Sequence, residues 1–410
     1  SFLQIFRKLS SSALPITKIA LRPAKEKVAI VVRYGACGDL VQSTPVFRLL
    51  KQQGYYVIAN VANDYAMAVL QHNPNVDEIA PQLRGLVPIP ELDEYNKELA
   101  KGCDRFVNLT GCTEEALLIP DTKYYLTLSK VMKEHPEAEQ RAVFEEILKE
   151  YRKIVNGKNY YDAHLERAGF SERGLNGELY FSDTEELVAR DFRYRTRDRF
   201  LVLWSLSGSS YHKWYPYVQH AIQGVLDAIP EALVITVGDE ACQLMEKAES
   251  PRYHPRSGKW SLRHSLIMTK YADLVVGPET GILNAAGCFD TPKITLLSHS
   301  THDNLCKYWK NDYCLAPEDT FCHPCHMLHY VHPNKTGEKC YQCGVEHNEK
   351  AVTPGGIWSC PYINLFPDGK GEGTYFPLCV GHGMPPERVV ARIMEVYAKW
   401  RGRAAKGTGV

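Results

Sequence analysis

The chain has no excess of charge of either sign. Its 410 residues carry 48 Lys and Arg and 48 Asp and Glu, so the formal net charge is zero. No global field therefore draws the protein to nucleic acid or to an anionic membrane, although local patches can still form. No apolar run approaches the roughly 18 residues that span a bilayer, so we expect no membrane-spanning helix. A hydrophobic content of 44% and a charged content of 23% are typical of a folded globular protein.

The first 27 residues form a separate basic segment. This segment contains several lysines and arginines but only one acidic residue, Glu26. If it is helical, its apolar residues could share one face beside the basic ones. Such a segment can lie on an anionic membrane surface, and its composition also resembles a transit peptide. A helix packed against the body of the fold is the simpler alternative. Peripheral membrane contact through residues 1–25 is thus one hypothesis.

The most informative local pattern is the segment Val28–Pro45. A β-branched apolar run predicts a buried strand that breaks at Gly35, and Gly38 and Asp39 follow before an amphipathic helix begins near Leu40. Small residues in a strand-to-helix turn let a ligand approach the backbone closely. The helix N-terminus attracts anions. Asp39 is then either a helix cap or a catalytic base beside a bound ligand.

The second half of the chain repeats this plan. A strand at 200–204 leads into a polar loop, and the segment 271–287 holds a strand, a small-residue turn and a helix. Alternating strands and helices predict parallel, doubly wound sheets, hence an α/β fold. The candidate ligand-binding residues of these loops are Ser207, Gly208, Ser209, Lys213, Glu279, Thr280, Gly281 and Asn284. Lys213 could instead be a surface lysine, and Thr280 could be only an N-cap.

In this order, the motifs resemble those of glycosyltransferase family 9, the ADP-heptose–lipopolysaccharide heptosyltransferases and their relatives. That family opens with a VRxGxxGD…TP segment, which the residues from Val32 to Pro45 match. It also carries a glycine/serine loop with a lysine-tryptophan pair, matched by Gly208 and Lys213–Trp214. Its aspartate-threonine-glycine turn is matched in part by 279–281. The resemblance spans about residues 28 to 300 and the final helix, with a divergent middle.

The resemblance implies the GT-B architecture, in which two Rossmann-like domains face a ligand cleft. We expect an acceptor-side domain over residues 28–185 and a nucleotide-sugar-binding domain over residues 186–382. The remaining residues, 383–410, would form a helix that crosses back to the first domain, followed by a tail. Pro385 and the amphipathic pattern that follows it predict that helix.

The resemblance also implies an inverting, metal-independent transfer, and the chain has no Asp-x-Asp metal motif. A sugar would move from a nucleotide-diphosphate donor, with an ADP-sugar expected, to a hydroxyl of a glycan or lipopolysaccharide-type acceptor. Asp39 would be the general base, and Lys213 would stabilise the departing diphosphate. Backbone N–H groups at Thr280 and Gly281 would hold the same diphosphate. Glu279 would bind a sugar or ribose hydroxyl.

Two positions depart from the family pattern. Glu279 stands where the family usually has Asp, and Asn284 where it usually has a histidine. These departures leave room for a non-catalytic, zinc-stabilised interaction scaffold. Transfer to a modified nucleobase in DNA or to a protein is another alternative, because a Cys/His-rich insertion and a row of arginines could bind such a polymer. Four arginines at alternate positions from Arg193 to Arg199 would share one face of an extended segment. They would suit a polymeric acceptor or simply a solvated edge.

Cysteines are concentrated near the C-terminus, in a Cys/His-rich insertion at 314–379. Two CxxC pairs resemble a zinc ribbon or treble-clef site, with the ligands Cys322, Cys325, Cys340 and Cys343. A bound zinc ion would supply the stability that a stretch rich in Pro and Gly lacks. Reduced cysteines without a metal are the main alternative. Disulfides come third, because scattered single cysteines and no recognisable signal peptide favour a reducing compartment, so we expect a cytoplasmic protein.

Overall fold

The computed structural model describes residues 27–82, 87, 91–113, 158–208, 213–320, 323–324 and 377–404. Several predictions fall outside the described residues. They concern most of the basic N-terminal segment, most of the Cys/His-rich insertion, and the site residues Ser209, Cys322, Cys325, Cys340 and Cys343.

A four-stranded parallel sheet forms the first domain, with the strand order β3-β2-β1-β4. β1 is buried along its whole length, as expected for an apolar β-branched strand covered on both faces. The predicted strand and the helix after it are therefore confirmed. The elements of this domain are β1 (Val28–Arg33), α3 (Cys37–Gln52), β2 (Tyr56–Ala62), α4 (Asn63–Leu70), β3 (Glu78–Gln82), α5 (Leu92–Lys101), β4 (Arg105–Asn108) and α9 (Tyr160–Arg167).

A five-stranded parallel sheet forms the second domain, with the order β7-β6-β5-β8-β9. Its strand order reverses beside β5, and such switch points open a crevice at the carboxyl ends of the strands. The elements are β5 (Phe200–Ser205), α11 (Val218–Ala228), β6 (Ala232–Val237), η3 (Glu240–Met245), β7 (Tyr253–Pro255), α12 (Leu262–Tyr271), β8 (Leu274–Pro278), α13 (Gly281–Gly287), β9 (Lys293–Leu296), α14 (His302–Leu305), α15 (Leu378–Gly381) and α16 (Pro386–Ala404).

The segment between the two sheets is helical, and this corrects the extended arginine face expected there. Helix α10 (Asp183–Arg195) begins at a capping box, in which Ser182 Oγ accepts from the Glu185 N–H and the Glu185 carboxylate accepts from the Ser182 N–H. Arg193 is buried, with its Nη2 atom 3.0 Å from both carboxylate oxygens of Asp273. This arginine has a structural role, since its charge is fully paired inside the fold.

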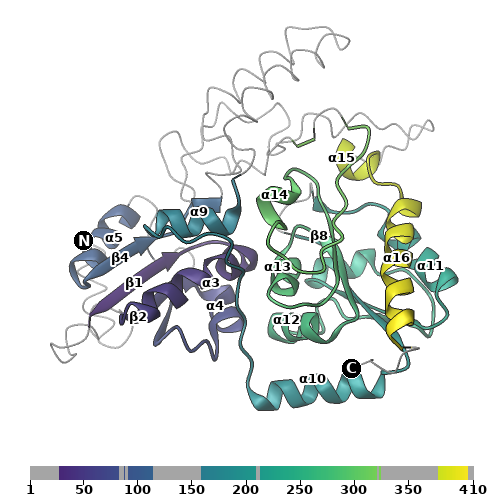
Figure 1. Ribbon diagram of the computed structural model, residues 1–410, viewed down its shortest axis with the longest axis horizontal. Helices are drawn as coiled ribbons and strands as arrows, with labels where there is room; N and C mark the ends of the chain where they lie inside the picture. Colours follow the sequence, from purple (N-terminus) through teal and green to yellow (C-terminus); the bar gives the residue numbers. More distant parts are fainter. Residues whose placement is uncertain are drawn as a thin grey trace, which may run out of the picture.

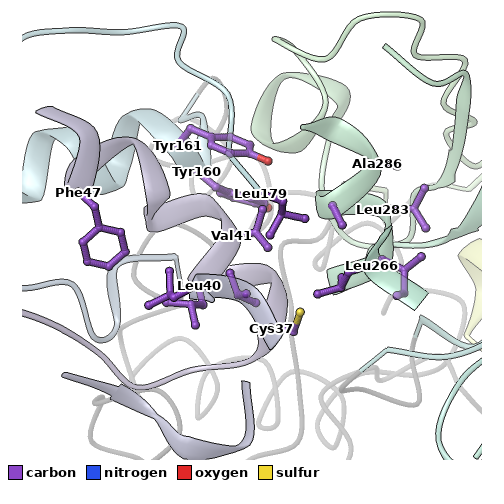
Figure 2. Close-up of a cluster of buried hydrophobic side chains, with 14 of the residues drawn as sticks. Cys37, Leu40, Val41, Phe47, Tyr160, Tyr161, Leu179, Leu266, Leu283 and Ala286 are labelled. Atoms are coloured by element: carbon purple, nitrogen blue, oxygen red, sulfur yellow. The ribbon is translucent and has the colours of Figure 1, made fainter. Parts of the chain in front are cut away.

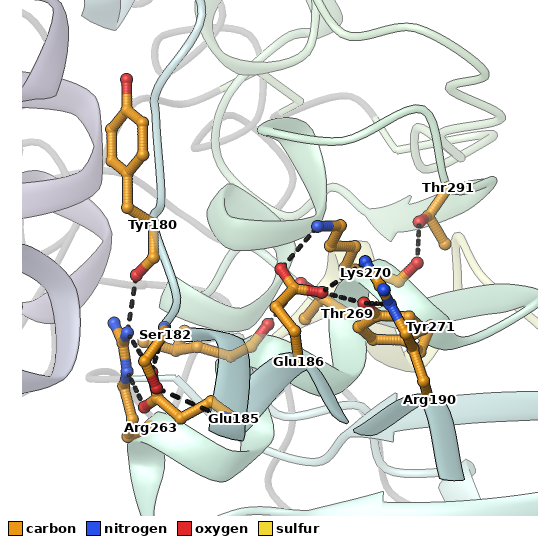
Figure 3. A network of polar contacts seen from close by, with 11 residues as sticks. Tyr180, Ser182, Glu185, Glu186, Arg190, Arg263, Thr269, Lys270, Tyr271 and Thr291 are labelled. Carbon is orange, nitrogen blue, oxygen red and sulfur yellow. Dashed lines mark hydrogen bonds and ion pairs between the residues drawn. The ribbon is translucent and has the colours of Figure 1, made fainter. Parts of the chain in front are cut away.

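Helix α10 is joined to α12 by a polar network (Figure 3). The Arg263 Nε atom lies 2.7 Å from Glu185 Oε1, and Lys270 Nζ lies 2.6 Å from Glu186 Oε1. The hydrogen bond from Arg263 lowers the pKa of Glu185 to about 2. Arg263 also donates to the carbonyl of Ala68 in the first domain. One guanidinium therefore connects the linking helix, α12 and the first domain.

The last helix stays with the second domain, so the predicted crossing back is wrong for the described residues. Figure 1 shows α16 beside α11, on the side of the second sheet away from the first domain. Val389 and Ile393 join the second-domain core, and the Phe200 ring lies 5.3 Å from that of Tyr397 and 5.4 Å from that of Trp400. These contacts bury the apolar face of the helix against the second domain. No helix in the described part of the chain is long and apolar enough to cross a membrane.

The two domains meet where α3 faces α13 (Figure 2). Cys37 and Val41 of α3 lie on one side of this apolar contact, and Leu283 and Ala286 of α13 lie on the other. The backbones approach so closely that a Cβ atom on Gly281 would lie 2.8 Å from Cys37 Sγ. Position 281 therefore requires a glycine because there is no space for a side chain. The sequence pattern alone would explain this glycine only by the turn.

Candidate active site

One cavity of about 570 Å³ lies where the carboxyl ends of the two sheets face each other. This volume is within the range of roughly 300–1,000 Å³ that is usual for small-molecule sites. The structure brings to its wall the predicted residues Gly38, Asp39, Ser207, Gly208, Lys213, Glu279, Thr280, Gly281 and Asn284. Gly35 is not part of the wall. A Cβ atom there would lie 2.9 Å from both Arg33 Nη1 and Asp39 Oδ2, so this glycine makes room for their contact.

Asp39 stands in the first turn of α3 and is held from two sides. Its Oδ2 atom accepts a hydrogen bond of 2.8 Å from the Ala36 N–H, and its Oδ1 atom lies 3.2 Å from Nη2 of the buried Arg33. The capping contact shows that Asp39 has a structural role. A carboxylate has about four lone-pair sites, so these contacts leave room for a ligand hydroxyl. The carboxylate is thus fixed at the first-domain wall of the cavity.

Lys213 follows the loop after β5 and is only 9% exposed. Its ammonium donates a hydrogen bond of 3.1 Å to the carbonyl of Glu279. A surface lysine, the alternative from the sequence, does not fit this burial. A cation in a partly enclosed cavity interacts with an anionic ligand more strongly than one in bulk water does. The second-domain wall therefore carries a fixed positive charge.

Thr280 caps helix α13 and also contacts the neighbouring strand end. Its Oγ1 atom accepts from the Leu283 N–H at 3.4 Å and lies 3.2 Å from Ser205 Oγ. The N-cap role is thus present, and Thr280 still lines the cavity. Gly208 packs against it, since a Cβ atom on Gly208 would lie 3.2 Å from both Thr280 Cγ2 and Lys213 Cδ.

Glu279 is buried and surrounded by hydrogen-bond donors. Ser298 Oγ donates to Oε2 at 2.8 Å, His299 Nδ1 lies 2.6 Å from the same oxygen, and Ser300 Oγ donates to Oε1. Burial raises the pKa of Glu279, but His299, Lys213 and Ser300 together outweigh burial and hold that pKa well below its ordinary value. Burial also lowers the pKa of His299. At neutral pH the pair is therefore a carboxylate and a neutral imidazole.

Asn284 connects the two domains. Its Oδ1 atom accepts from Gln42 Nε2 at 2.9 Å and from the Tyr161 hydroxyl at 3.3 Å, and its Nδ2 atom donates to the carbonyl of Thr280 at 2.9 Å. Its amide oxygen is thus used for contacts with the first domain. The departure from the family pattern at this position has a structural explanation.

Sequence reasoning missed several residues of the cavity wall. They lie at the ends of strands, in the segments that follow strands, or on helices α3 and α9, and they are Gln42, Thr113, Tyr160, Ser205, Asp239, Glu240, His299 and Ser300. Their positions in the sequence could have indicated most of them. Polar side chains at the carboxyl ends of parallel strands converge at one edge of the sheet. The run that follows β9, Ser298–His302, is an example.

A separate group of metal-binding side chain types lies beyond β9. The donor atoms of His302, Asp312 and Cys314 lie within 4.8 Å of one another. His302 Nε2 is 3.4 Å from Asp312 Oδ2, while Asp312 Oδ1 is buried without a hydrogen-bond partner. Nitrogen, oxygen and sulfur donors of these types bind zinc and iron in proteins. This cluster is where the described part of the chain could hold a metal.

No protein-family model and no curated protein matches the sequence. Among solved structures, the Escherichia coli ADP-heptose lipopolysaccharide heptosyltransferase II aligns with a TM-score of 0.54 and 11% identity, over 91% of this chain and 99% of that one. TibC, an iron-containing dodecameric glycosyltransferase from enterotoxigenic E. coli H10407, aligns with a TM-score of 0.53 and 10% identity, over 92% and 77%.

The chain has the GT-B fold. The predicted class, two Rossmann-like domains with parallel sheets, is confirmed by this likeness and by the two sheets themselves. At such low identity the GT-B fold by itself does not fix the reaction, because one fold hosts many functions. The function has to be argued from the residues of the cavity.

Proposed function

We propose that the protein is a glycosyltransferase that moves a sugar from a nucleotide-diphosphate donor to an acceptor hydroxyl. The observation that carries this proposal is one cavity whose wall includes Asp39 of the first domain and Lys213 of the second. A fixed carboxylate and a fixed cation on opposite domains are the two groups that the transfer requires. The resemblance in the sequence motifs supports the same two roles.

Asp39 would act as the general base. It removes the proton of the acceptor hydroxyl as that oxygen attacks the anomeric carbon of the donor. Lys213 would stabilise the diphosphate that leaves with extra negative charge. With the base on the acceptor side and the cation on the donor side, a single displacement follows, and this inverts the anomeric configuration. Lys213 would supply the positive charge, so the proposed step needs no catalytic metal.

The expected donor is an ADP-sugar. TibC is known in complex with ADP-D-β-D-heptose, and that structure aligns with this chain with a TM-score of 0.51 at 8% identity. For the acceptor we propose a glycan of the lipopolysaccharide type, as for the E. coli heptosyltransferase II. Peripheral membrane contact through residues 1–25 would suit such a lipid-linked acceptor.

We also propose a structural metal near the C-terminal insertion. The ligands Cys322, Cys325, Cys340 and Cys343 lie outside the described residues, but four thiolates are a donor set that binds zinc tightly. TibC contains iron. Metal analysis of protein purified without added metal tests the proposal, with about one equivalent of zinc or iron expected. Well under one equivalent of either metal would contradict it.

The experiment that tests the transferase proposal is a thermal-shift and nucleotide-release panel. It uses ADP-, UDP-, GDP-, CMP- and dTDP-sugars with the wild type, Lys213→Ala and Asp39→Asn. The exposed Lys247→Ala is the matched control for loss of a lysine. We expect one nucleotide class to stabilise the wild type and the control, and Lys213→Ala to lose this gain. Asp39→Asn should bind the donor and lose turnover.

Two results would contradict this assignment. If no nucleotide sugar binds the wild type, the chain is better explained as an interaction scaffold with a transferase fold. If Asp39→Asn retains near-normal turnover, the base is another residue.

A further inference from the structure

The carboxylate of Glu279 is turned toward the wall of the cavity. Both of its oxygens are bonded by residues of the loop after β9, namely Ser298, His299 and Ser300. With Oε2 already shared by a hydroxyl and an imidazole, this carboxylate is poorly placed to bind a ligand hydroxyl directly. Its main effect is to orient the imidazole of His299, which also lines the cavity.

This contact fixes the tautomer of His299. An ionised carboxylate only accepts hydrogen bonds, so Nδ1 must carry the proton that points at Glu279. In the neutral ring, Nε2 then holds a lone pair. Among the described residues, none donates a hydrogen bond to Nε2, and this atom is not among the buried atoms that lack a partner. The cavity wall therefore presents a hydrogen-bond acceptor at this point.

The chemistry of the neighbouring groups selects what this acceptor can bind. Lys213, whose ammonium contacts the backbone of Glu279, is suited to the diphosphate. Phosphate oxygens only accept hydrogen bonds, so they cannot bind an acceptor such as Nε2, whereas sugar hydroxyls can donate to it. A neutral acceptor beside the diphosphate position is suited to the sugar attached to it.

We propose that His299 accepts a hydrogen bond from a hydroxyl of the donor sugar, with Glu279 as its positioning residue. This inference rests on the proposed function and adds to it the element that recognises the sugar. It assigns the two parts of the donor to different side chains. Lys213 would bind the nucleotide diphosphate whether or not a sugar is attached, and His299 would contribute only when the sugar is present.

The test is isothermal titration of ADP and of ADP-heptose with the wild type, His299→Phe and Glu279→Gln. Phe keeps the ring volume and removes both nitrogens. Gln at 279 carries both a donor and an acceptor. With its nitrogen toward Nδ1 the imidazole proton moves to Nε2 and the acceptor is lost, whereas with its oxygen toward Nδ1 the tautomer is kept. His220→Phe is the matched control, because His220 is exposed and is not part of the cavity wall.

Loss of one hydrogen bond predicts a dissociation constant for ADP-heptose that rises about tenfold in His299→Phe and by no more than that in Glu279→Gln, while that for ADP changes less than about twofold. His220→Phe should match the wild type for both ligands. If ADP and ADP-heptose weaken equally, or if neither weakens, the assignment of His299 to the sugar is overturned. If His299→Phe does not fold, His299→Ala, which also removes Nε2, decides. If the wild type binds neither ligand, the ADP-sugar proposal itself fails, a result distinct from the others.

Discussion

His164 makes the acid stability of the protein predictable. It lies on α9, fully buried, with Nδ1 2.7 Å from the carbonyl oxygen of Tyr160 and with Nε2 lacking a hydrogen-bond partner. Burial, followed by the charge of the Arg33 guanidinium, lowers the pKa of His164 to about 3, against a smaller opposing effect of the Tyr160 carbonyl and of Asp39. This imidazole therefore stays neutral in the folded protein far below the pH at which an exposed histidine takes up a proton.

The sign and size of the effect follow from linkage. Below about pH 6.5 the unfolded chain protonates His164 and the folded chain does not, so the unfolded state binds more protons and stability falls as pH falls. Each pH unit in this window costs about 1.4 kcal/mol of unfolding free energy once the unfolded imidazole is mostly charged. Between pH 6.5 and pH 5 the loss from this one residue is about 2 kcal/mol.

The assay is urea unfolding followed by fluorescence at pH 7.5, 6.5, 5.5 and 5.0. His164→Gln removes the titrating group and keeps a hydrogen-bond donor. We expect the wild type to lose about 2 kcal/mol more than this variant between pH 6.5 and 5, although the variant is less stable at neutral pH. His220→Gln, a change of an exposed histidine, should follow the wild type. Parallel pH dependence of the wild type and His164→Gln would refute the reasoning.

Three further substitutions test the packing around the site. Gly281→Ala forces a Cβ atom to within 2.8 Å of Cys37 Sγ and should lower stability by about 1–3 kcal/mol, seen as a lower melting temperature. Asn284→Ala leaves the buried amide of Gln42 without its acceptor and should cost about 1–3 kcal/mol in urea unfolding. Asp273→Asn removes the charge that faces a buried arginine of α10, and about 3–5 kcal/mol should be lost in calorimetry. An unchanged transition in any of these would contradict the contact concerned.

Much of the fold could be predicted from the sequence, because strands that are buried on both faces are continuous apolar runs in the sequence. β1 and the helix after it follow from one segment, and β5 and β8 from two others. The final helix shows the limit of this reasoning. Its periodicity predicts which face is buried but not the surface it is buried against, and the aromatic contacts of Phe200 place it on the second domain. Helix α10 was missed because the alternate arginines were read as an extended segment, although Ser182 and Glu185 have the spacing of a capping box.

For the site, the sequence predicted the residues of the two strand-to-helix turns, and the structure places them around one cavity. It could not predict how each side chain is used. The Glu279 carboxylate accepts hydrogen bonds from residues about twenty positions further along the chain. These residues reach it because β8 and β9 are neighbours in the sheet, which the sequence does not show. Arg33 forms an ion pair with Asp39. From the sequence alone, Arg33 is only the last residue of a predicted strand.

Asn284 and His299 together show why motif spacing alone misleads at this site. At the position where the resembled family usually has a histidine, this chain has an asparagine, whose amide is consumed by Gln42, Tyr161 and the Thr280 carbonyl. An imidazole nevertheless lines the cavity, supplied by the loop after β9 and oriented by Glu279. A hydrogen-bonding group can thus be supplied by another strand end of the same sheet edge, since all of these ends open onto one crevice. The donor preference of this protein should therefore be sought in the loop after β9 rather than at the motif position where the histidine is missing.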